Sequence, residues 1–303
     1  MPTAMVLGRY RRGRRIASAV RETRKRLEAA GWTVDSAVVA KKKTLRRHAS
    51  AAARDGADIV VAVGGDGAVL QVVNALAGGN TTLGIVPKGT GNLLAGNLRV
   101  PTSMDKAIAV LLAGHTRRID LGRVQVGGKE RDFAVACGIG FDAVVMDGTA
   151  QTQKRRWGKL AYVATAVREG RKVQDVTFEV KVDGRTETMT AAQVFVANFG
   201  RIGSLIEPRR RVIPDDGLFD VIIVKASGPV DGLRAGLEAL RQAELGESGG
   251  GRVMRLRGTK VAVSAHPRQL VETDGSIVGR TPVTANIRPE ALTVLVPGGR
   301  SGR

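Results

Sequence analysis

The sequence holds a single cysteine, Cys137, so no disulfide can form within the chain. Aromatic residues make up only 3% of the 303 residues, which leaves few side chains on which single-stranded nucleic acids could stack. No apolar run approaches the roughly 20 residues that a membrane-spanning helix needs. The N-terminus has no long apolar stretch after its charges, as a secretory signal would. We therefore expect a cytoplasmic protein.

Acidic residues are in the minority, with 28 Asp and Glu against 48 Lys and Arg, and the formal net charge is +20. Residues 9–47 alone hold 14 basic residues and three acidic ones. Such a surface attracts nucleic acid, anionic membrane or phosphorylated ligands, although a solvated basic face explains the charge equally well. Because no helix-turn-helix, zinc or RNA-recognition motif is present, we expect no nucleic-acid partner.

The first third of the chain alternates strand-like and helix-like patterns. Short apolar runs predict strands over 4–7, 33–39, 59–63 and 83–86, and apolar residues at helical spacing predict helices over 16–30, 45–54, 69–76 and 105–112. The near-continuous apolar runs are typical of parallel strands covered on both faces. This pattern predicts a doubly wound, Rossmann-like α/β domain over about residues 1–120.

After residue 120 the pattern changes to short strands separated by turns. Hairpins are expected around Gly127-Gly128 and Asp183-Gly184, the second joining strands over 176–182 and 186–197. Further strands are expected over 219–224, 260–264, 268–272 and 283–287, with helices near 160–168 and 230–243. Residues 121–287 therefore form an antiparallel second domain. The last strand, over 292–296, could return to either domain, and we assign about 288–303 to the first.

Gly64-Gly65-Asp66-Gly67 follows the predicted strand over 59–63 directly. Ligands of open α/β sheets bind beyond the carboxyl ends of the strands, and glycines let the backbone approach a phosphate. The helix that follows offers free N–H groups to an anion. A carboxylate among these donors repels a phosphate unless a cation such as Mg²⁺ lies between them. The alternative is a tight turn in which Asp66 caps the helix.

A second polar, glycine-rich turn follows the next buried strand. It reads Lys88-Gly89-Thr90-Gly91-Asn92 and supplies a hydroxyl, an amide and a positive charge. Because the carboxyl ends of adjacent parallel strands meet at one edge of a sheet, we expect this turn to lie beside the first. The first turn is not a Walker A loop, since no Gly-Lys-Ser/Thr follows its glycines.

The first turn, GGDG, followed by GTGNLLAGNLRVP from the second turn onward, resembles the diacylglycerol kinase catalytic-domain family, which includes bacterial lipid kinases and sphingosine kinases. Three later segments resemble further family motifs in the same order, namely Val194–Asn198 with the glycines after it, Arg211–Val221 (RVIPDDGLFDV) and Glu272–Gly279 (ETDGSIVG). The resemblance runs from about residue 30 to 297. NAD kinases share the first turn, but the later motifs favour the lipid branch.

The resemblance implies a nucleotide-binding α/β domain followed by a β-sandwich domain, with ATP and Mg²⁺ as cofactors. The implied ATP contacts are Gly64, Gly65, Asp66, Gly67, Ala68, Lys88, Gly89, Thr90 and Asn92. Asp66 would organise the catalytic Mg²⁺, and Asp120 would be a second acid near it. A structural Mg²⁺ would be held by the Asp216 carboxylate and by the backbone carbonyls of Ile213 and Leu218. The alternative at Asp216 is an ordinary turn.

The sequence departs from the family pattern where a carboxylate base is expected. Ser276 stands at the position of the family's glutamate, with Asp274 two residues before it, and both are candidate catalytic residues. Ala68 stands in place of a threonine. Two functions follow from these observations. One is an ATP-dependent kinase that phosphorylates a hydroxyl of a lipid such as diacylglycerol or a sphingoid base, and the other is a catalytically impaired relative that binds nucleotide or lipid.

A lipid substrate requires access to a membrane surface. Basic segments contribute about 1 kcal/mol per Lys or Arg to binding at an anionic surface. Four candidate segments are Arg9–Arg15, Lys41–Arg47, Lys154–Arg156 and Arg209–Arg211. We therefore expect peripheral, salt-sensitive association with the inner face of the membrane. Both a monomer and a homodimer are compatible with the sequence.

Overall fold

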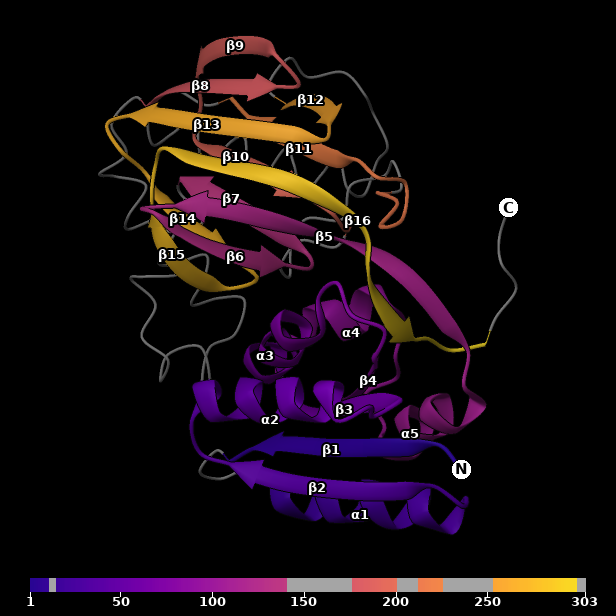
Figure 1. Ribbon diagram of the computed structural model, residues 1–303. Coiled ribbons are helices and arrows are strands. Elements are labelled where there is room, and N and C mark those ends of the chain that lie inside the picture. Colours follow the sequence, from indigo (N-terminus) through magenta and orange to yellow (C-terminus); the bar gives the residue numbers. More distant parts are fainter. Residues whose placement is uncertain (11–14, 141–175, 201–211, 226–252, 299–303) are drawn as a thin grey trace. The chain divides into compact units, whose positions relative to one another are not determined.

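The computed structural model describes residues 1–10, 15–140, 176–200, 212–225 and 253–298. The chain divides into two compact units, Met1–Leu121 with Arg288–Arg303 and Gly122–Ile287. It passes from one unit to the other within two strands, β5 (Thr116–Val126) and β16 (Val283–Leu295). The predicted combination of an α/β unit with an antiparallel β-rich unit is confirmed (Figure 1).

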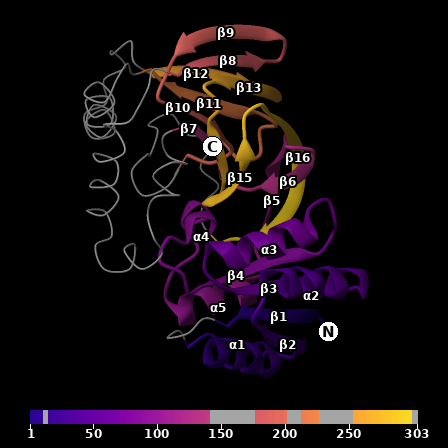
Figure 2. The same cartoon turned by 90° about the vertical axis from the view of Figure 1, so that its left-hand side faces the viewer.

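The first unit is built around a parallel sheet. Its further elements are β1 (Thr3–Arg9), α1 (Ile16–Ala29), β2 (Thr33–Val39), α2 (Lys42–Arg54), β3 (Ile59–Gly64), α3 (Asp66–Leu76), β4 (Thr82–Pro87), α4 (Leu93–Asn97) and α5 (Met104–Ala113). The strands lie in the order β2, β1, β3, β4, and β16 adds a parallel contact through Val294 and Leu83. Helices α1 and α5 cover one face of this sheet, and α2 and α3 cover the other (Figure 2).

The burial pattern explains why these segments form a covered parallel sheet. All six residues of β3 are buried, as a central strand with helices on both faces requires. Helix α1 buries Ile16, Val20 and Leu27, which share one face at helical spacing. Gly8 of β1 lets this helix approach closely, because a Cβ there would lie 2.6 Å from Val20 and 2.7 Å from Ile16.

Two helices of the first unit begin one turn earlier than the apolar pattern predicts. Helix α2 begins at Lys42 and α3 at Asp66. The first turn of α3 is held by the carbonyl of Gly65, which accepts from the N–H groups of Ala68 at 2.8 Å and Val69 at 3.2 Å. A first turn needs no buried side chain, so apolar periodicity places helix starts too late.

The second unit consists of antiparallel strands in the described part of the chain. They are the end of β5, β6 (Lys129–Phe133), β7 (Ala136–Gly140), β8 (Thr177–Val182), β9 (Arg185–Thr190), β10 (Gln193–Ala197), β11 (Phe219–Val224), β12 (Val253–Gly258), β13 (Lys260–His266), β14 (Leu270–Thr273), β15 (Ser276–Arg280) and the start of β16. One sheet has the strand order β12, β11, β10, β7, β14, β15. In the other sheet, the strands of this unit pair in the order β16, β13, β8, β9. Buried apolar side chains fill the space between them, including Phe133 and Phe219, whose rings stack with centroids 5.7 Å apart.

Several strand boundaries differ from the prediction. The segment predicted as one strand over 186–197 is two strands, β9 and β10, which belong to different sheets. The strands predicted over 283–287 and 292–296 form one strand, β16. Strands β7, β12 and β15 were not predicted. The predicted helices near 160–168 and 230–243 lie outside the described residues.

Both predicted hairpin turns are confirmed. Asp183 and Gly184 join β8 to β9 with φ of +47° and +93°, as a two-residue turn requires. Gly127 and Gly128 join β5 to β6. Among the described helices, none is long and apolar enough to cross a membrane.

Candidate active site

The two glycine-rich turns of the first unit lie against each other, backbone to backbone. The N–H of Lys88 donates to the carbonyl of Gly64 at 2.7 Å, which continues the pairing of β3 with β4 beyond the strand ends. A Cβ on Gly65 would lie 2.7 Å from the Cα of Gly89, closer than real Cβ contacts allow. The predicted adjacency of the two turns is therefore present, and it requires glycine on both sides.

Asp66 locks the two turns together. It is the first residue of α3, and its carboxylate accepts from the N–H of Asn92 at 2.9 Å and of Leu93 at 2.5 Å. Gly91 also packs here, since a Cβ on it would lie 2.7 Å from Oδ2 of Asp66. The residue that caps α3 is Gly65, so the carboxylate satisfies the start of α4 and not that of its own helix. This corrects the alternative in which Asp66 caps its own helix.

Asn92 shapes the second turn from within. Its Oδ1 accepts from the N–H of Gly89 at 2.8 Å, and its Nδ2 donates to the carbonyl of Gly89 at 3.2 Å. Its φ of +50° lies in the left-handed region, which asparagine tolerates better than most residues. Thr90, which stands inside this turn, is exposed. The turn is thus closed by hydrogen bonds between Asn92 and Gly89 and exposed at Thr90.

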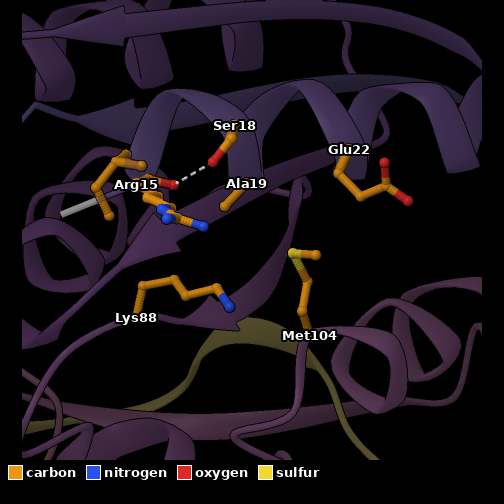
Figure 3. Close-up of a pocket in the computed structure, with 7 residues that line it drawn as sticks. Arg15, Ser18, Ala19, Glu22, Lys88 and Met104 are labelled. Atoms are coloured by element: carbon orange, nitrogen blue, oxygen red, sulfur yellow. Dashed lines mark hydrogen bonds between the residues drawn. The ribbon is translucent and has the colours of Figure 1, made fainter.

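Basic side chains flank the two turns. Lys42, at the start of α2, places its Nζ 3.6 Å from the position that a Cβ on Gly67 would occupy. Lys88 lines a pocket of about 540 Å³ together with Arg15 and Met104, which face it from the starts of α1 and α5 (Figure 3). The pocket is also lined by Ile16, Ser18, Ala19 and Glu22. Arg15 and Lys88 bring two positive charges to this pocket and Glu22 brings one negative charge, which favours the binding of an anion.

Asp120, the predicted second acid, is almost completely buried in the first unit, with 1% of its surface exposed. Its Oδ1 accepts from the N–H of Glu290 at 2.7 Å. Glu290 has a φ of +48°, so the carboxylate supports an irregular position within β16. The structure therefore gives Asp120 a role in holding β16 beside β5, and its role near a metal stays a prediction.

Asp274 belongs to the second unit and has a similar locking role. Its carboxylate accepts from three consecutive backbone N–H groups, those of Ala134 at 2.7 Å, Val135 at 2.9 Å and Ala136 at 3.1 Å. Asp274 has a φ of +45° and stands in the turn between β14 and β15. Ser276 follows it as the first residue of β15. Their catalytic roles stay predictions.

A buried carboxylate lies close to this turn. Glu272 is 5% exposed, and its Oε2 accepts from the N–H of Gly275 at 2.7 Å. Burial raises the pKa of the Cys137 thiol well above its usual value, and the charges of Glu272 and Asp274 raise that pKa further. Cys137 is therefore held neutral, in agreement with a packing role.

The segment predicted to hold a structural Mg²⁺ fits a divalent cation poorly. The Oδ1 of Asp216 accepts from the N–H of Leu218 at 3.1 Å, and its Oδ2 is paired with the guanidinium of Arg257. Ile213, whose carbonyl was the third predicted ligand, is 40% exposed. Within the described residues, no group of three or more His, Cys, Asp or Glu residues could hold a metal ion. The magnesium site at Ile213, Asp216 and Leu218 stays a prediction.

The sequence analysis assigned no individual role to Lys42, Asn198 or Arg257, although Lys42 lies in the predicted basic segment Lys41–Arg47 and Asn198 ends the motif Val194–Asn198. Asn198 is fully buried and donates to the carbonyl of Ala134 at 3.0 Å. Arg257, which pairs with Asp216, was missed altogether. The alternation of Arg255 and Arg257 in MRLRG could have suggested a charged strand face. The acidic residues that this face contacts depend on the strand register, and the register cannot be read from the sequence.

Two family models match two successive parts of the chain. The family model described as "Diacylglycerol kinase catalytic domain" matches residues 8–124, and the one described as "YegS C-terminal NAD kinase beta sandwich-like domain" matches residues 135–296. A diacylglycerol kinase of Mycobacterium tuberculosis is 32% identical over 283 residues, covering 90% of this chain and 87% of that protein. A diacylglycerol kinase of Bacillus subtilis is 27% identical over 232 residues, covering 74% of this chain and 73% of that protein.

A longer relative and two solved structures complete the comparison. An uncharacterized protein of Synechocystis is 27% identical over 245 residues, and the chain covers 56% of its length. The crystal structure of a diacylglycerol kinase from Bacillus anthracis superimposes with a TM-score of 0.73 at 18% identity, over 98% of this chain and 97% of that one. A second crystal structure from that organism gives a TM-score of 0.80 at 20% identity with the same coverage. At these identities the structures support the fold alone.

Proposed function

Because the chain belongs to the diacylglycerol kinase family, we propose that it is an ATP-dependent lipid kinase. It would transfer the γ-phosphate of ATP to a hydroxyl of a lipid such as diacylglycerol or a sphingoid base. The observation that carries the proposal is the pair of glycine-rich turns joined by Asp66. This edge of a parallel sheet is where nucleotides bind in open α/β folds.

The proposed contacts to ATP follow from the geometry of these turns. Gly65, Gly67 and Gly89 carry no side chains that would keep a phosphate from the backbone, and Thr90 offers a hydroxyl at the exposed tip. Lys42 and Lys88 add positive charge on either side of the turns. Because phosphoryl transfer depends mainly on positioning and on neutralising charge, such a cradle supplies much of what the reaction requires.

A divalent cation fits the donor chemistry at Asp66. Mg²⁺ is commonly held in kinases by one or two carboxylates together with the phosphates of the substrate, and a carboxylate oxygen keeps a second acceptor position after it takes one N–H. When bound, such an ion would neutralise the charge of the transferred phosphate. Asp66 would then serve both the fold and the nucleotide.

The first experiment is transfer of labelled γ-phosphate from ATP with Mg²⁺ to a panel of hydroxyl lipids in mixed micelles. We expect a labelled lipid from the native chain and a large loss in Asp66→Asn, which keeps the size of the side chain and one acceptor oxygen. The matched control is Asp55→Asn, an exposed acid of the same unit, which should transfer phosphate normally. Absence of any labelled lipid from a folded, ATP-binding sample would contradict the proposal.

The second candidate function is a nucleotide- or lipid-binding protein with impaired catalysis. Ser276 favours it, because a serine hydroxyl cannot accept a proton at neutral pH as a carboxylate does, and loss of a general base typically costs about 10²–10⁴ in rate. Substitution of Ser276→Glu separates the two functions. A large gain in transfer would identify an impaired enzyme, whereas an active native chain that gains nothing uses another base.

Peripheral binding to an anionic membrane is part of the proposal. Lys41, Lys43, Arg46 and Arg47 are exposed around the first two turns of α2, which supports an electrostatic contact with lipid head groups. We expect the chain to sediment with anionic vesicles at low salt and to be released at high salt, where such charges are screened. Equal binding to neutral vesicles would contradict this mode of association.

A further inference from the structure

Two arginines and an aspartate of the second unit share one face of a strand pair. In the antiparallel ladder of β11 and β12, Asp220 lies directly opposite Arg257. Arg255 is two residues away on β12 and therefore points to the same face. Its Nε approaches Oδ1 of Asp220 at 2.8 Å, and the Nε of Arg257 approaches the same oxygen at 3.3 Å. Asp220 is 1% exposed, so this carboxylate requires its cations.

The turn before β11 brings a second carboxylate to the same guanidinium. Gly217 has a φ of +72°, which bends the chain so that Asp216 reaches over the end of the strand pair. Oδ2 of Asp216 is paired with Nη2 of Arg257, and Oδ1 accepts from the N–H of Leu218 at 3.1 Å. Arg257 thus bridges both carboxylates, and two arginines balance two aspartates within the cluster.

We propose that the guanidinium of Arg257 supplies the positive charge at the Asp216 turn, so that this chain holds the turn without a divalent cation. A guanidinium is planar, permanently charged and able to donate to two carboxylates at once, which is the bridging task that a metal ion would otherwise perform. The proposal concerns the fold of the second unit and does not depend on the proposed transfer of phosphate.

A divalent cation at Asp216 would have to displace Arg257. Mg²⁺ requires near-ideal octahedral oxygen coordination and gives up its water reluctantly, so a carboxylate oxygen already paired with a guanidinium, itself a cation, is a poor ligand. The displaced guanidinium would also lie beside the ion as a like charge. Removing Arg257 reverses this situation, because Asp216 then loses its guanidinium partner while Asp220 keeps Arg255.

The test compares the melting temperature of the full chain, without nucleotide, in EDTA and in excess MgCl₂ at matched ionic strength. We expect Mg²⁺ to change the melting temperature of the native chain by no more than it changes that of Asp216→Asn. We expect Arg257→Ala to melt at a lower temperature in EDTA and to regain stability with Mg²⁺, by linkage of binding to folding. The matched control is Arg255→Ala, which loses a contact to Asp220 but keeps Arg257 at Asp216, and so should gain no Mg²⁺ response.

Two results would overturn the proposal. One is a native chain that Mg²⁺ stabilises and that loses this stabilisation in Asp216→Asn, since the ion would then bind at the turn despite Arg257. The other is a folded Arg257→Ala variant that gains no response to Mg²⁺. Should that variant not fold, Arg257→Lys and direct Mn²⁺ binding decide the question. The proposal then expects Arg257→Lys to fold. It also expects the native chain and Asp216→Asn to bind equal amounts of Mn²⁺. If the native chain bound a Mn²⁺ ion that Asp216→Asn did not bind, the proposal would be contradicted.

Discussion

Asp66 and Asp274 stand in similar Asp-Gly turns of different units, and both carboxylates are engaged by backbone N–H groups from a distant part of the chain. Asp66 follows a parallel strand and accepts from Asn92 and Leu93. Asp274 stands between two antiparallel strands and accepts from Ala134, Val135 and Ala136. The same local motif therefore performs the same structural task in two unrelated kinds of sheet.

The difference between the two turns lies in what each one joins. Asp66 connects two turns at the edge where nucleotides bind in this type of sheet, so stability and the proposed chemistry depend on the same carboxylate. Asp274 instead fastens the segment between β6 and β7 to the turn at β14, and its donors are almost completely buried. A carboxylate in a glycine turn is therefore not by itself a sign of catalysis.

The largest expected effect is that of Asp274→Ala. Three buried N–H groups would lose a charged acceptor, and unsatisfied buried donors cost about 1–3 kcal/mol each, so we expect a loss of about 3–5 kcal/mol in the free energy of unfolding. Urea denaturation measures this loss. Asp274→Asn, which keeps one acceptor oxygen, should lose less, and an equal loss in both variants would contradict the account.

The next effect is that of Asp66→Ala, which removes the acceptor of two N–H groups that are partly buried. We expect a loss of about 2–4 kcal/mol in the free energy of unfolding together with loss of phosphate transfer. Asp66→Asn should keep more of the stability while losing the transfer. If Asp66→Ala were as stable as the native chain, the lock between the two turns would be refuted.

A smaller effect is expected for Gly89→Ala, which tests the contact between the turns without touching a charge. The added Cβ would lie 2.6 Å from the Cα of Gly65 and 2.5 Å from Oδ1 of Asn92. Overpacking of this kind typically costs about 1–3 kcal/mol. Gly67→Ala is the control for stability, because its Cβ would meet only the flexible end of Lys42 at 3.5 Å and should leave the unfolding midpoint nearly unchanged.

The smallest effect concerns a third Asp-Gly turn, which is exposed. The N–H of Thr259 lowers the pKa of Asp183, with further donors at Lys260 and the Thr259 hydroxyl. A carboxylate whose pKa is lowered in the folded state stabilises the fold above its unfolded pKa of about 3.9, and this contribution is lost as the pH falls through the folded pKa. Solvent screening keeps the contribution below about 1 kcal/mol.

The measurement for this turn is the melting temperature of the native chain and of Asp183→Asn as a function of pH. We expect the native chain to be more stable at neutral pH and the difference to shrink below about pH 4. Asp35→Asn, an exposed aspartate on β2, is the control. A difference between the native chain and Asp183→Asn that grows on acidification would have the wrong sign and contradict the assignment.

Much of the fold and part of the site could be predicted because the relevant patterns are local. Buried runs such as Ile59–Gly64 predict covered parallel strands, and glycine-rich turns that follow two of them predict a shared ligand-binding edge. Asp183-Gly184 predicts a two-residue hairpin turn, because this pattern too is local to the sequence. Strands β12 and β15 were missed, since their residues are mostly part-buried and show no clear alternation.

The sequence by itself determined which segments pair as local hairpins, which strands are covered on both faces, and which turns can approach a phosphate. Only the tertiary structure decided which partners the carboxylates take. Asp66 meets donors 26 and 27 positions away, Asp274 meets donors about 140 positions away, and Arg257 meets Asp216 across 41 positions. Such contacts depend on strand order and register, which arise from packing of the whole sheet and leave no local trace in the residues.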